Sequence, residues 1–266
     1  MGYQQPAFMI SHPASAIAIS DVSARGSTTA LSDDSKRALI DSRQGEQASF
    51  TAAGSDAGVE FDLLTAPTIN RWVIPAGHTM NQISGNWQLY SDDNSSFSSG
   101  SLRLNEAISG TGVFDGVVLT TTTERYWLFQ ALTTTTQTFT LGEFWIGERV
   151  AISSGYVQPG FRSEWEHHIA EDVIGGRDIA LELTPPRRRF SLEIRYVVPA
   201  TSDALILEEI LRLGRSTPFW YWTPDDTDTG PYLVKLEASA TRAQESAAPQ
   251  AQIAYTVSLT MIEQTT

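Results

Sequence analysis

Short segments with strand-like composition, separated by turn-forming residues, dominate this sequence of 266 residues. In "RYWLFQALTTTTQTFTLGEFWIG", from Arg125 to Gly147, two aromatic-rich segments flank four consecutive threonines. β-branched and aromatic residues favour strands, and each segment is shorter than a typical helix. We therefore expect two strands here that pair antiparallel with each other and bury their aromatic side chains. A chain built from such segments is limited to a mainly β fold.

The same pattern recurs on both sides of this segment. "VEFDLL", "NRWVI" and "NWQLY" precede it, and "FSLEIRY", "YLVKLE" and "YTVSLTM" follow it. The three later segments alternate apolar and polar residues, which is typical of antiparallel strands with one buried face. By contrast, residues 21–58 are rich in Ser, Asp, Gly and Ala. They are expected to form loop, with a short helix or turn near "SKRALIDS".

One segment, "SDALILEEILRLGR", has a clear helical pattern. Leu207 and Ile210 belong to an apolar stripe at helical spacing. Ser202 or Asp203 can cap the start, and Gly214 can end the helix. We expect the longest helix of the chain at residues 203–213.

The length of the chain is sufficient for two domains. The strand pattern changes from irregular to strictly alternating after "ERVAISSGYVQPG", where Ser, Gly and Pro interrupt it. The sequence therefore predicts an N-terminal arm or first strand at residues 1–20, a β-sandwich at residues 21–150, and a second β domain at residues 155–266.

The net charge of −13 is evenly distributed. Residues 1–150 carry 8 basic and 15 acidic groups, and residues 151–266 carry 10 and 16. An acidic surface repels phosphate, so we expect no direct nucleic-acid binding. With two lysines and no apolar run near 18 residues, neither a basic membrane-binding patch nor a membrane-spanning helix is expected. The N-terminus lacks the pattern of a secretory signal peptide, and cysteine is absent.

No catalytic motif stands out. The four histidines are His12, His78, His167 and His168, and no H-E-x-x-H motif contains them. G-x-S-x-G, Walker and G-x-G-x-x-G motifs are absent as well. Pairs of acidic residues are common in an acidic chain and indicate no glycosidase. We expect a protein that is not an enzyme and needs no cofactor or metal ion.

Residues 41–147 resemble a discoidin, or galactose-binding-like, jelly-roll sandwich. "LIDSRQGEQASF", "GVEFDLLTAPTINRWVI", "GNWQLYSDDNSSF" and the aromatic segment that ends at Gly147 occur in the order of that family's early loop, acidic strand, hairpin and closing strands. The cysteine pair of many discoidin domains is missing, and Asn94 replaces a common glycine in the hairpin. The resemblance implies that the aromatic residues of the closing strands fill the core of a sandwich.

In discoidin-like modules, ligands bind on loops at one end of the sandwich. The matching loops are "IDSRQG" and "PAGHTMNQ", and their polar residues are Asp41, Arg43, His78 and Asn81. Asp41 is at the position where the family often holds a structural calcium ion. The resemblance implies a site for a glycan, and the lack of an aromatic residue in either loop implies weak binding.

The second half resembles the tube-type domain of bacteriophage distal tail and tail-tip proteins. "PPRRRFSLEIRYV", "LEEILRLGRSTPFWYWTPDD", "PYLVKLEA" and "YTVSLTMIEQ" follow that family's order of arginine-led strand, helix, apolar strand and closing strand. The resemblance implies a phage tail-tube-like β domain with one flanking helix. Such domains pack side by side into a ring that continues the tail tube.

Two clusters are candidates for a subunit interface. The arginine cluster contains Arg187, Arg188 and Arg189, and the aromatic cluster contains Phe219, Trp220, Tyr221 and Trp222. Arginines in an acidic protein can bind carboxylates of a neighbour, but they can also be solvated at the start of a strand. A strand with four aromatic residues is either central in its sheet or in contact with a partner chain.

Two classes of function remain from the sequence. The first is a structural virion protein of the tail tip, made in the host bacterial cytoplasm. It would form a ring of six or three copies, contact the tube and hub proteins, and carry a carbohydrate-binding module for host attachment. The alternative is a secreted or surface glycan-binding protein, or an accessory module of a hydrolase.

Overall fold

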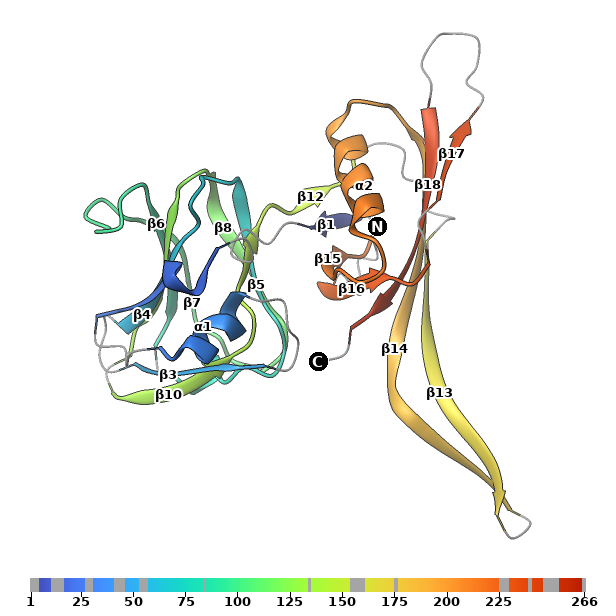
Figure 1. The fold of residues 1–266 in the computed structure, drawn as a ribbon, viewed down its shortest axis with the longest axis horizontal. Coiled ribbons are helices and arrows are strands. Elements are labelled where there is room, and N and C mark those ends of the chain that lie inside the picture. The colour runs from blue at the N-terminus through green and yellow to red at the C-terminus, as the bar shows by residue number, and fades with distance from the viewer. Residues whose placement is uncertain are drawn as a thin grey trace. The chain divides into compact units, whose positions relative to one another are not determined.

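The computed structural model describes most of the chain, and the mainly β fold predicted from the sequence is confirmed (Figure 1). The described residues are 5–10, 17–26, 31–40, 46–52, 57–83, 85–133, 135–153, 161–174, 177–224, 230–238, 241–245 and 254–264. Contacts divide the chain into two compact units. The sandwich unit contains residues 11–149, and the extended-sheet unit contains residues 1–10 and 150–265.

The sandwich unit contains one α-helix and ten strands in its described part, and the strands form three sheets. Its elements are η2 (Ile19–Asp21), β2 (Val22–Arg25), α1 (Asp33–Ile40), β3 (Ala48–Ala52), β4 (Ala57–Asp62), β5 (Ile69–Ile74), η3 (Met80–Gln82), β6 (Trp87–Asp92), β7 (Ser101–Glu106), β8 (Phe114–Thr122), β9 (Tyr126–Ala131), β10 (Gln137–Leu141) and β11 (Trp145–Gly147). The strand orders are β2-β4-β9-β6-β7, β11-β5-β8 and β10-β3.

Aromatic side chains from the five-stranded sheet pack against those from the two smaller sheets. Trp72 of β5 lies 4.9 Å from Phe129 of β9, and Trp87 of β6 lies 4.7 Å from Phe139 of β10, measured between ring centroids. The edge-to-face angles of 71° and 86° are favourable for aromatic pairs. These rings belong to one continuous core, which explains the aromatic content of the segment from Arg125 to Gly147.

The predicted pairing of the two strands in that segment is wrong. β9 lies between β4 and β6, whereas β10 pairs with β3 and β11 pairs with β5. The chain crosses from one layer to the other after β9, so the aromatic side chains meet through the core. Phe129 and Phe144 are 5.4 Å apart in this way. The expectation of loop at residues 21–58 is also wrong, since β2, β3 and the start of β4 lie there.

The extended-sheet unit contains one eight-stranded sheet and one helix in its described part. Its elements are β1 (Ala7–Met9), β12 (Val150–Ala151), β13 (Arg162–Ile174), β14 (Arg177–Val197), α2 (Ser202–Leu213), β15 (Phe219–Trp222), β16 (Tyr232–Leu236), β17 (Thr241–Glu245) and β18 (Ala254–Glu263). The order is β12-β1-β15-β16-β18-β14-β13, and β17 also pairs with β18. The N-terminal strand β1 is therefore an internal strand of this sheet.

The predicted helix is present as α2, although its cap differs from both candidates. Thr201 is the capping residue, and its Oγ1 accepts a hydrogen bond of 3.2 Å from the backbone N–H of Ala204. Asp203 instead accepts a hydrogen bond of 3.0 Å from the backbone N–H of Ser153. The buried side of α2 includes Leu207 and Ile210, which belong to the core that covers one face of the sheet.

β13 and β14 extend beyond the rest of their sheet as a two-stranded ribbon (Figure 1). β14 pairs with β18 from Arg189 to Val197. β13 and β14 remain paired with each other as far as Ile174 and Arg177. Two strands alone are marginally stable in water, so the described ribbon depends on the sheet from which it extends.

Candidate functional site

The two ends of the sandwich differ in their polar contacts. Strand register places Asp62, Asp92 and Tyr126 side by side at one end of the five-stranded sheet. Ala57, Trp87 and Ala131 lie side by side at the other end. We call the first the braced end, which contains Asp62, Ser91, Asp92, Arg103, Glu124 and Arg125. We call the second the loop end, which contains residues 46–47, 75–82, 111–113 and 140–143.

Backbone and amide hydrogen bonds hold the loop end together. The N–H of Gly77 donates to the carbonyl of Thr111 over 2.7 Å, and Gln47 Nε2 donates to the carbonyl of Gly77 over 3.2 Å. The N–H of Thr79 donates to the carbonyl of Thr140 over 2.8 Å. Four stretches that are far apart in the sequence therefore converge at this end.

The loop end contains one of the two loops that the discoidin resemblance selects and the residues that follow the other. Gln47, which contacts the loop at residues 75–82, comes shortly after "IDSRQG". Asp41 and Arg43 lie outside the described residues, so their predicted roles remain predictions. Gln47 was missed at the sequence level, because an isolated polar residue before a strand gives no signal of a site.

His78 and Asn81 differ in accessibility. The side chain of His78 is 1% exposed, and this burial lowers the pKa of its imidazole. The backbone near Gly112 raises the pKa and so offsets part of this lowering. A side chain so deeply buried does not reach a ligand on the surface. Asn81 lies on the short helix η3 and is exposed. Two of the four residues predicted to bind a ligand are described: His78 is buried, and Asn81 is exposed at the surface.

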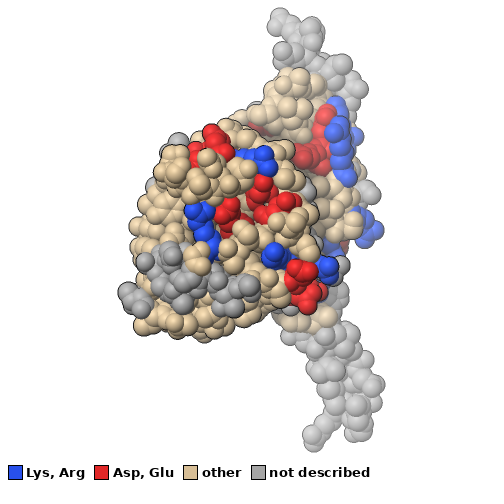
Figure 2. Space-filling view, turned by 60° about the vertical axis from the view of Figure 1, so that its left-hand side comes forward, with Lys and Arg blue, Asp and Glu red and all other residues tan. Residues whose placement is uncertain are grey.

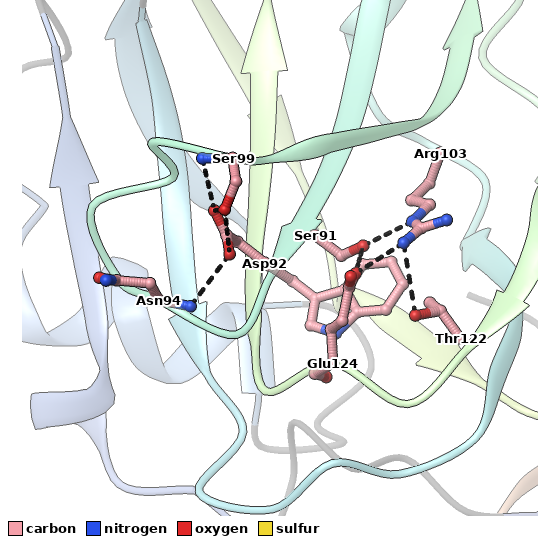
Figure 3. A network of polar contacts seen from close by, with 8 residues as sticks. Ser91, Asp92, Asn94, Ser99, Arg103, Thr122 and Glu124 are labelled. Atoms are coloured by element: carbon pink, nitrogen blue, oxygen red, sulfur yellow. Dashed lines mark hydrogen bonds and ion pairs between the residues drawn. The ribbon is translucent and has the colours of Figure 1, made fainter.

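At the braced end, an ion pair and its hydrogen bonds connect strands β6 and β7 to the turn between β8 and β9 (Figure 3). Arg103 Nη2 of β7 lies 2.9 Å from Glu124 Oε2, and Arg103 Nε donates to Ser91 Oγ of β6 over 2.7 Å. The Ser91 hydroxyl donates to the Glu124 carboxylate. The side chains of Arg103 and Glu124 are 13% and 21% exposed. These groups satisfy one another, so the network stabilises the fold and offers few donors to a ligand.

Asp92 folds the hairpin loop that follows β6 (Figure 3). Its carboxylate accepts hydrogen bonds of 3.1 Å from the backbone N–H groups of both Asn94 and Ser99. Arg25 covers the same loop, because it donates to the carbonyl of Ser96 and lies 4.8 Å from the centroid of the Phe97 ring. The cluster of Asp, Asn and Ser in this hairpin therefore has a structural role.

Asp62 and Arg125 form a second ion pair at the braced end. Arg125 Nε and Nη2 donate to the two carboxylate oxygens of Asp62 over 2.6 and 2.7 Å. This bidentate contact lowers the pKa of Asp62 from its usual value of 3.8, against the effect of burial. Acidic and basic side chains are interspersed on this unit, instead of forming a field of one sign (Figure 2).

The aromatic cluster proposed as a subunit interface is buried. β15 is an internal strand between β1 and β16, and Phe219, Trp220, Tyr221 and Trp222 are 0 to 3% exposed. Phe219 and Tyr221 belong to the core on the side of α2. Of the two alternatives given by the sequence, the central strand is the one observed, and these side chains offer no exposed face to a partner.

The arginine cluster is divided between the two faces of the sheet. Arg188 lies on the same face as the core residue Phe190, and its guanidinium is 4.8 Å from the ring centroids of both Trp165 and Tyr232. Arg187 and Arg189 alternate with it and lie on the opposite face, where Arg189 Nε is 2.6 Å from Glu237 Oε2. We call this second side of β13, β14, β18 and β16 the outer face.

The outer face contains a shallow polar depression of about 500 Å³. It is lined by Arg162, Glu164, Arg189, Ser191, Leu192, Glu193, Ser258, Leu259 and Thr260. Two basic and two acidic groups give this lining no net charge, although the chain carries −13. Charges of both signs with hydroxyl groups between them favour a polar partner over an apolar one.

Comparisons with known proteins give a structural likeness to a carbohydrate-binding module. No family model and no curated protein matches this sequence. A solved structure, CBM32-1 from a family 31 glycoside hydrolase from Clostridium perfringens, is similar over 49% of this chain and 96% of that chain. The identity is 15% and the TM-score is 0.37.

Among the described residues, no group of three or more His, Cys, Asp or Glu side chains could hold a metal ion. The helices in that part of the chain are too short or too polar to cross a membrane.

Proposed function

We propose that this protein is a non-catalytic structural component of a bacteriophage tail tip, with a sandwich unit that binds a glycan on the host surface. The convergence of four loops at the loop end is the observation that carries the glycan-binding part. A stable aromatic core below these loops holds them in place, and loops on a rigid scaffold are the usual position of binding residues. The braced end contrasts with this, because its polar groups bind one another.

The polar groups at the loop end fit a sugar better than a charged ligand. Gln47 and Asn81 are exposed side-chain amides, and an amide both donates and accepts hydrogen bonds, as sugar hydroxyls do. No aromatic residue in the loop at residues 75–82 offers a stacking surface, so the expected affinity is weak. Specificity would come from the few polar groups that converge there.

The extended-sheet unit is the part that would assemble. The order of its segments resembles that of tail-tube-type domains, which is the support for a ring of six or three copies next to tube and hub proteins. Arg187 and Arg189 on the outer face are available for contacts between copies, whereas the aromatic residues of β15 are not. Localisation in the virion tail tip is part of the same proposal.

Titration with surface polysaccharides of candidate hosts tests the glycan-binding part. We expect weak saturable binding by the full chain, and a loss of at least about tenfold in affinity, or about 1.4 kcal/mol, for the double variant Gln47→Ala/Asn81→Ala. Arg103→Lys, at the braced end, is the control and keeps the affinity of the unmodified chain. Binding that is unchanged in the double variant places the site elsewhere, and binding to no glycan removes this part of the proposal.

The alternative function is a secreted or surface glycan-binding protein, or an accessory module of a hydrolase. Such a protein would bind glycan at the same loop-end site but would not assemble into a ring. Mass measurement of the purified full chain separates the two: rings of three or six copies support the tail-tip role, and a monomer that binds glycan supports the alternative.

A further inference from the structure

The charged residues of the outer face follow a regular pattern in the strand register. Directly opposite residues in an antiparallel sheet have side chains on the same face, so the register defines rows across the strands. One row contains Glu164 of β13, Arg189 of β14, Ile262 of β18 and Lys235 of β16. The next contains Arg162, Ser191 and Thr260. Glu237 continues this second row, since its N–H donates to the carbonyl of Thr260 over 2.9 Å.

Two further rows flank these. Glu166 and Arg187 are paired on the side of the first row, and Glu193 and Ser258 are paired on the side of the second. On this face, each of β13, β14 and β16 therefore presents both acidic and basic residues, at different positions along the strand. Neighbouring rows are about 7 Å apart, and neighbouring strands are about 4.8 Å apart.

This pattern is complementary to itself under a two-fold rotation. An axis that lies in the face, at right angles to the strands and midway between the first and second rows, exchanges those rows. It places Glu164 opposite Arg162 of a second copy, and Lys235 opposite Glu237 of the second copy. It also exchanges the flanking rows, so that Arg187 lies opposite Glu193 of the second copy. Each of these pairs joins opposite charges, and each occurs twice because the contact is symmetric.

We propose that the outer face of β13, β14, β18 and β16 binds the same face of a second copy of this chain about that two-fold axis. The axis reverses the strand direction, so β14 of one copy lies antiparallel to β14 of the other. Face-to-face sheets keep their strand directions within about 30° of each other, so the pairs near the axis stay opposite one another despite the twist of the sheet.

The charge of the rest of the chain favours this face as the point of contact. Two copies with a net charge of −13 each repel one another on approach. The lining of the depression has two basic and two acidic groups, so this part of the face adds no net charge to that repulsion. Opposite charges placed in register then select the orientation and the partner.

The charges on this face can bind a partner without losing their own contacts. Glu193 is paired with Arg195, and Glu237 is paired with Arg189. A carboxylate has two oxygens with about four acceptor positions, so each can accept a second cation from the other copy. These side chains are partly exposed, which makes the contact sensitive to salt and moderate in strength.

A pair of charge-reversal variants of the full chain tests the contact. The basic variant carries Glu164→Arg and Glu193→Arg, and the acidic variant carries Arg162→Glu and Arg187→Glu. In either variant alone, the two-fold axis places like charges opposite one another at four positions. We expect sedimentation equilibrium to show a dimer of the unmodified chain that weakens as salt is raised, and a loss of at least about tenfold in dimer affinity for each variant.

Mixing the two variants gives the decisive measurement. In the mixed pair, the same axis places acid opposite base at all four positions, so we expect a heterodimer that neither variant forms with itself. Its formation also shows that both variants are folded. The control Arg37→Glu/Arg215→Glu makes the same change in net charge as the acidic variant, at exposed positions that do not belong to the outer face, and keeps the dimer. An unmodified chain without a dimer, variants that dimerise as it does, or a mixture that stays monomeric would each overturn the proposal.

The two-fold contact differs from the contacts that would build the proposed ring, because a two-fold contact is complete with two copies. The outcomes for the two proposals are therefore separate. Rings of three or six copies that persist in the basic variant, which keeps Arg187 and Arg189, and that never pair would leave the tail-tip role intact and overturn the two-fold contact. A dimer that mixes as described, without any ring, would support the two-fold contact and remove the ring.

Discussion

The braced end and the loop end of the sandwich are both rich in polar residues, but their hydrogen bonds go to different partners. At the braced end, the side chains of Arg103, Glu124 and Ser91 bind one another. At the loop end, backbone groups hold the loops, as between Gly77 and Thr111, while Asn81 is left exposed. A dense cluster of charges that bind one another is therefore a weak sign of a binding site, whereas accessible polar groups on loops held by backbone bonds stay available to a ligand.

The largest expected effect tests how closely the segment between the loop end and β6 packs against the residues that follow β9. A Cβ atom at Gly85 would lie 1.7 Å from the carbonyl oxygen of Leu132, which is backbone and cannot move aside. We expect Gly85→Ala to lower the free energy of unfolding by about 3 kcal/mol or more. Gly112→Ala is the matched control, because nothing lies within 4 Å of its Cβ position. Urea denaturation measures the stability of both variants, and equal stabilities would show that the segment around Gly85 is loosely packed.

The second prediction concerns the braced end. Arg103→Ala removes the partner of Glu124 and Ser91 in a partly buried position, and we expect a loss of about 2 kcal/mol of stability. Arg103→Lys keeps the charge but loses the forked geometry, so its cost is smaller. Glycan affinity should stay the same in both variants. A change in affinity without a change in the unfolding midpoint would contradict the assignment of this end as structural.

The two ends should also respond to acid in different pH ranges. Burial lowers the pKa of His78 from 6.5, so the unfolded chain binds this proton more readily than the folded chain. The contribution of His78 to stability is therefore fully present above pH 6.5, and it is lost as the pH falls from 6.5 through the pKa of His78 in the folded state. The Arg125 guanidinium lowers the pKa of Asp62 from 3.8, so this contribution is present above 3.8 and is lost as pH falls through its folded pKa.

The unfolding free energy as a function of pH measures this difference. One proton changes the free energy by at most about 1.4 kcal/mol per pH unit. His78→Gln should remove the slope just below pH 6.5 and leave the slope below pH 3.8, whereas Asp62→Asn should do the reverse. If both slopes persist in both variants, the acid response comes from other groups.

The sequence was sufficient for many of the strands and for the long helix, but not for β2 and β3, and not for strand pairing or burial. Alternation over "FSLEIRY" predicts β14 because a period of two is a local property. The partners of β9 and β10 depend on where the chain crosses between layers, which no local pattern records. His78 shows the same limit at the site, since a polar residue in a loop gave no sign that neighbouring segments would bury it. The two-fold pattern of the outer face needs the register of four strands and is invisible in any single one.

The smallest expected effect comes from two exposed asparagines, one at each end. Asn94 Oδ1 accepts a hydrogen bond of 3.0 Å from the backbone N–H of Ser96, which fixes the hairpin loop. Asn81, in the described part of the chain, makes no such side-chain bond. We expect Asn94→Ala to cost about 0.5 to 1 kcal/mol, and Asn81→Ala to change stability by less than about 0.5 kcal/mol. Chemical denaturation of both variants in parallel measures the difference. Because both residues are exposed amides, the variants differ mainly in whether the amide has a structural partner. A clear loss of stability in Asn81→Ala would mean that this side chain holds its loop, and Asn81 would then belong with the structural residues of the braced end.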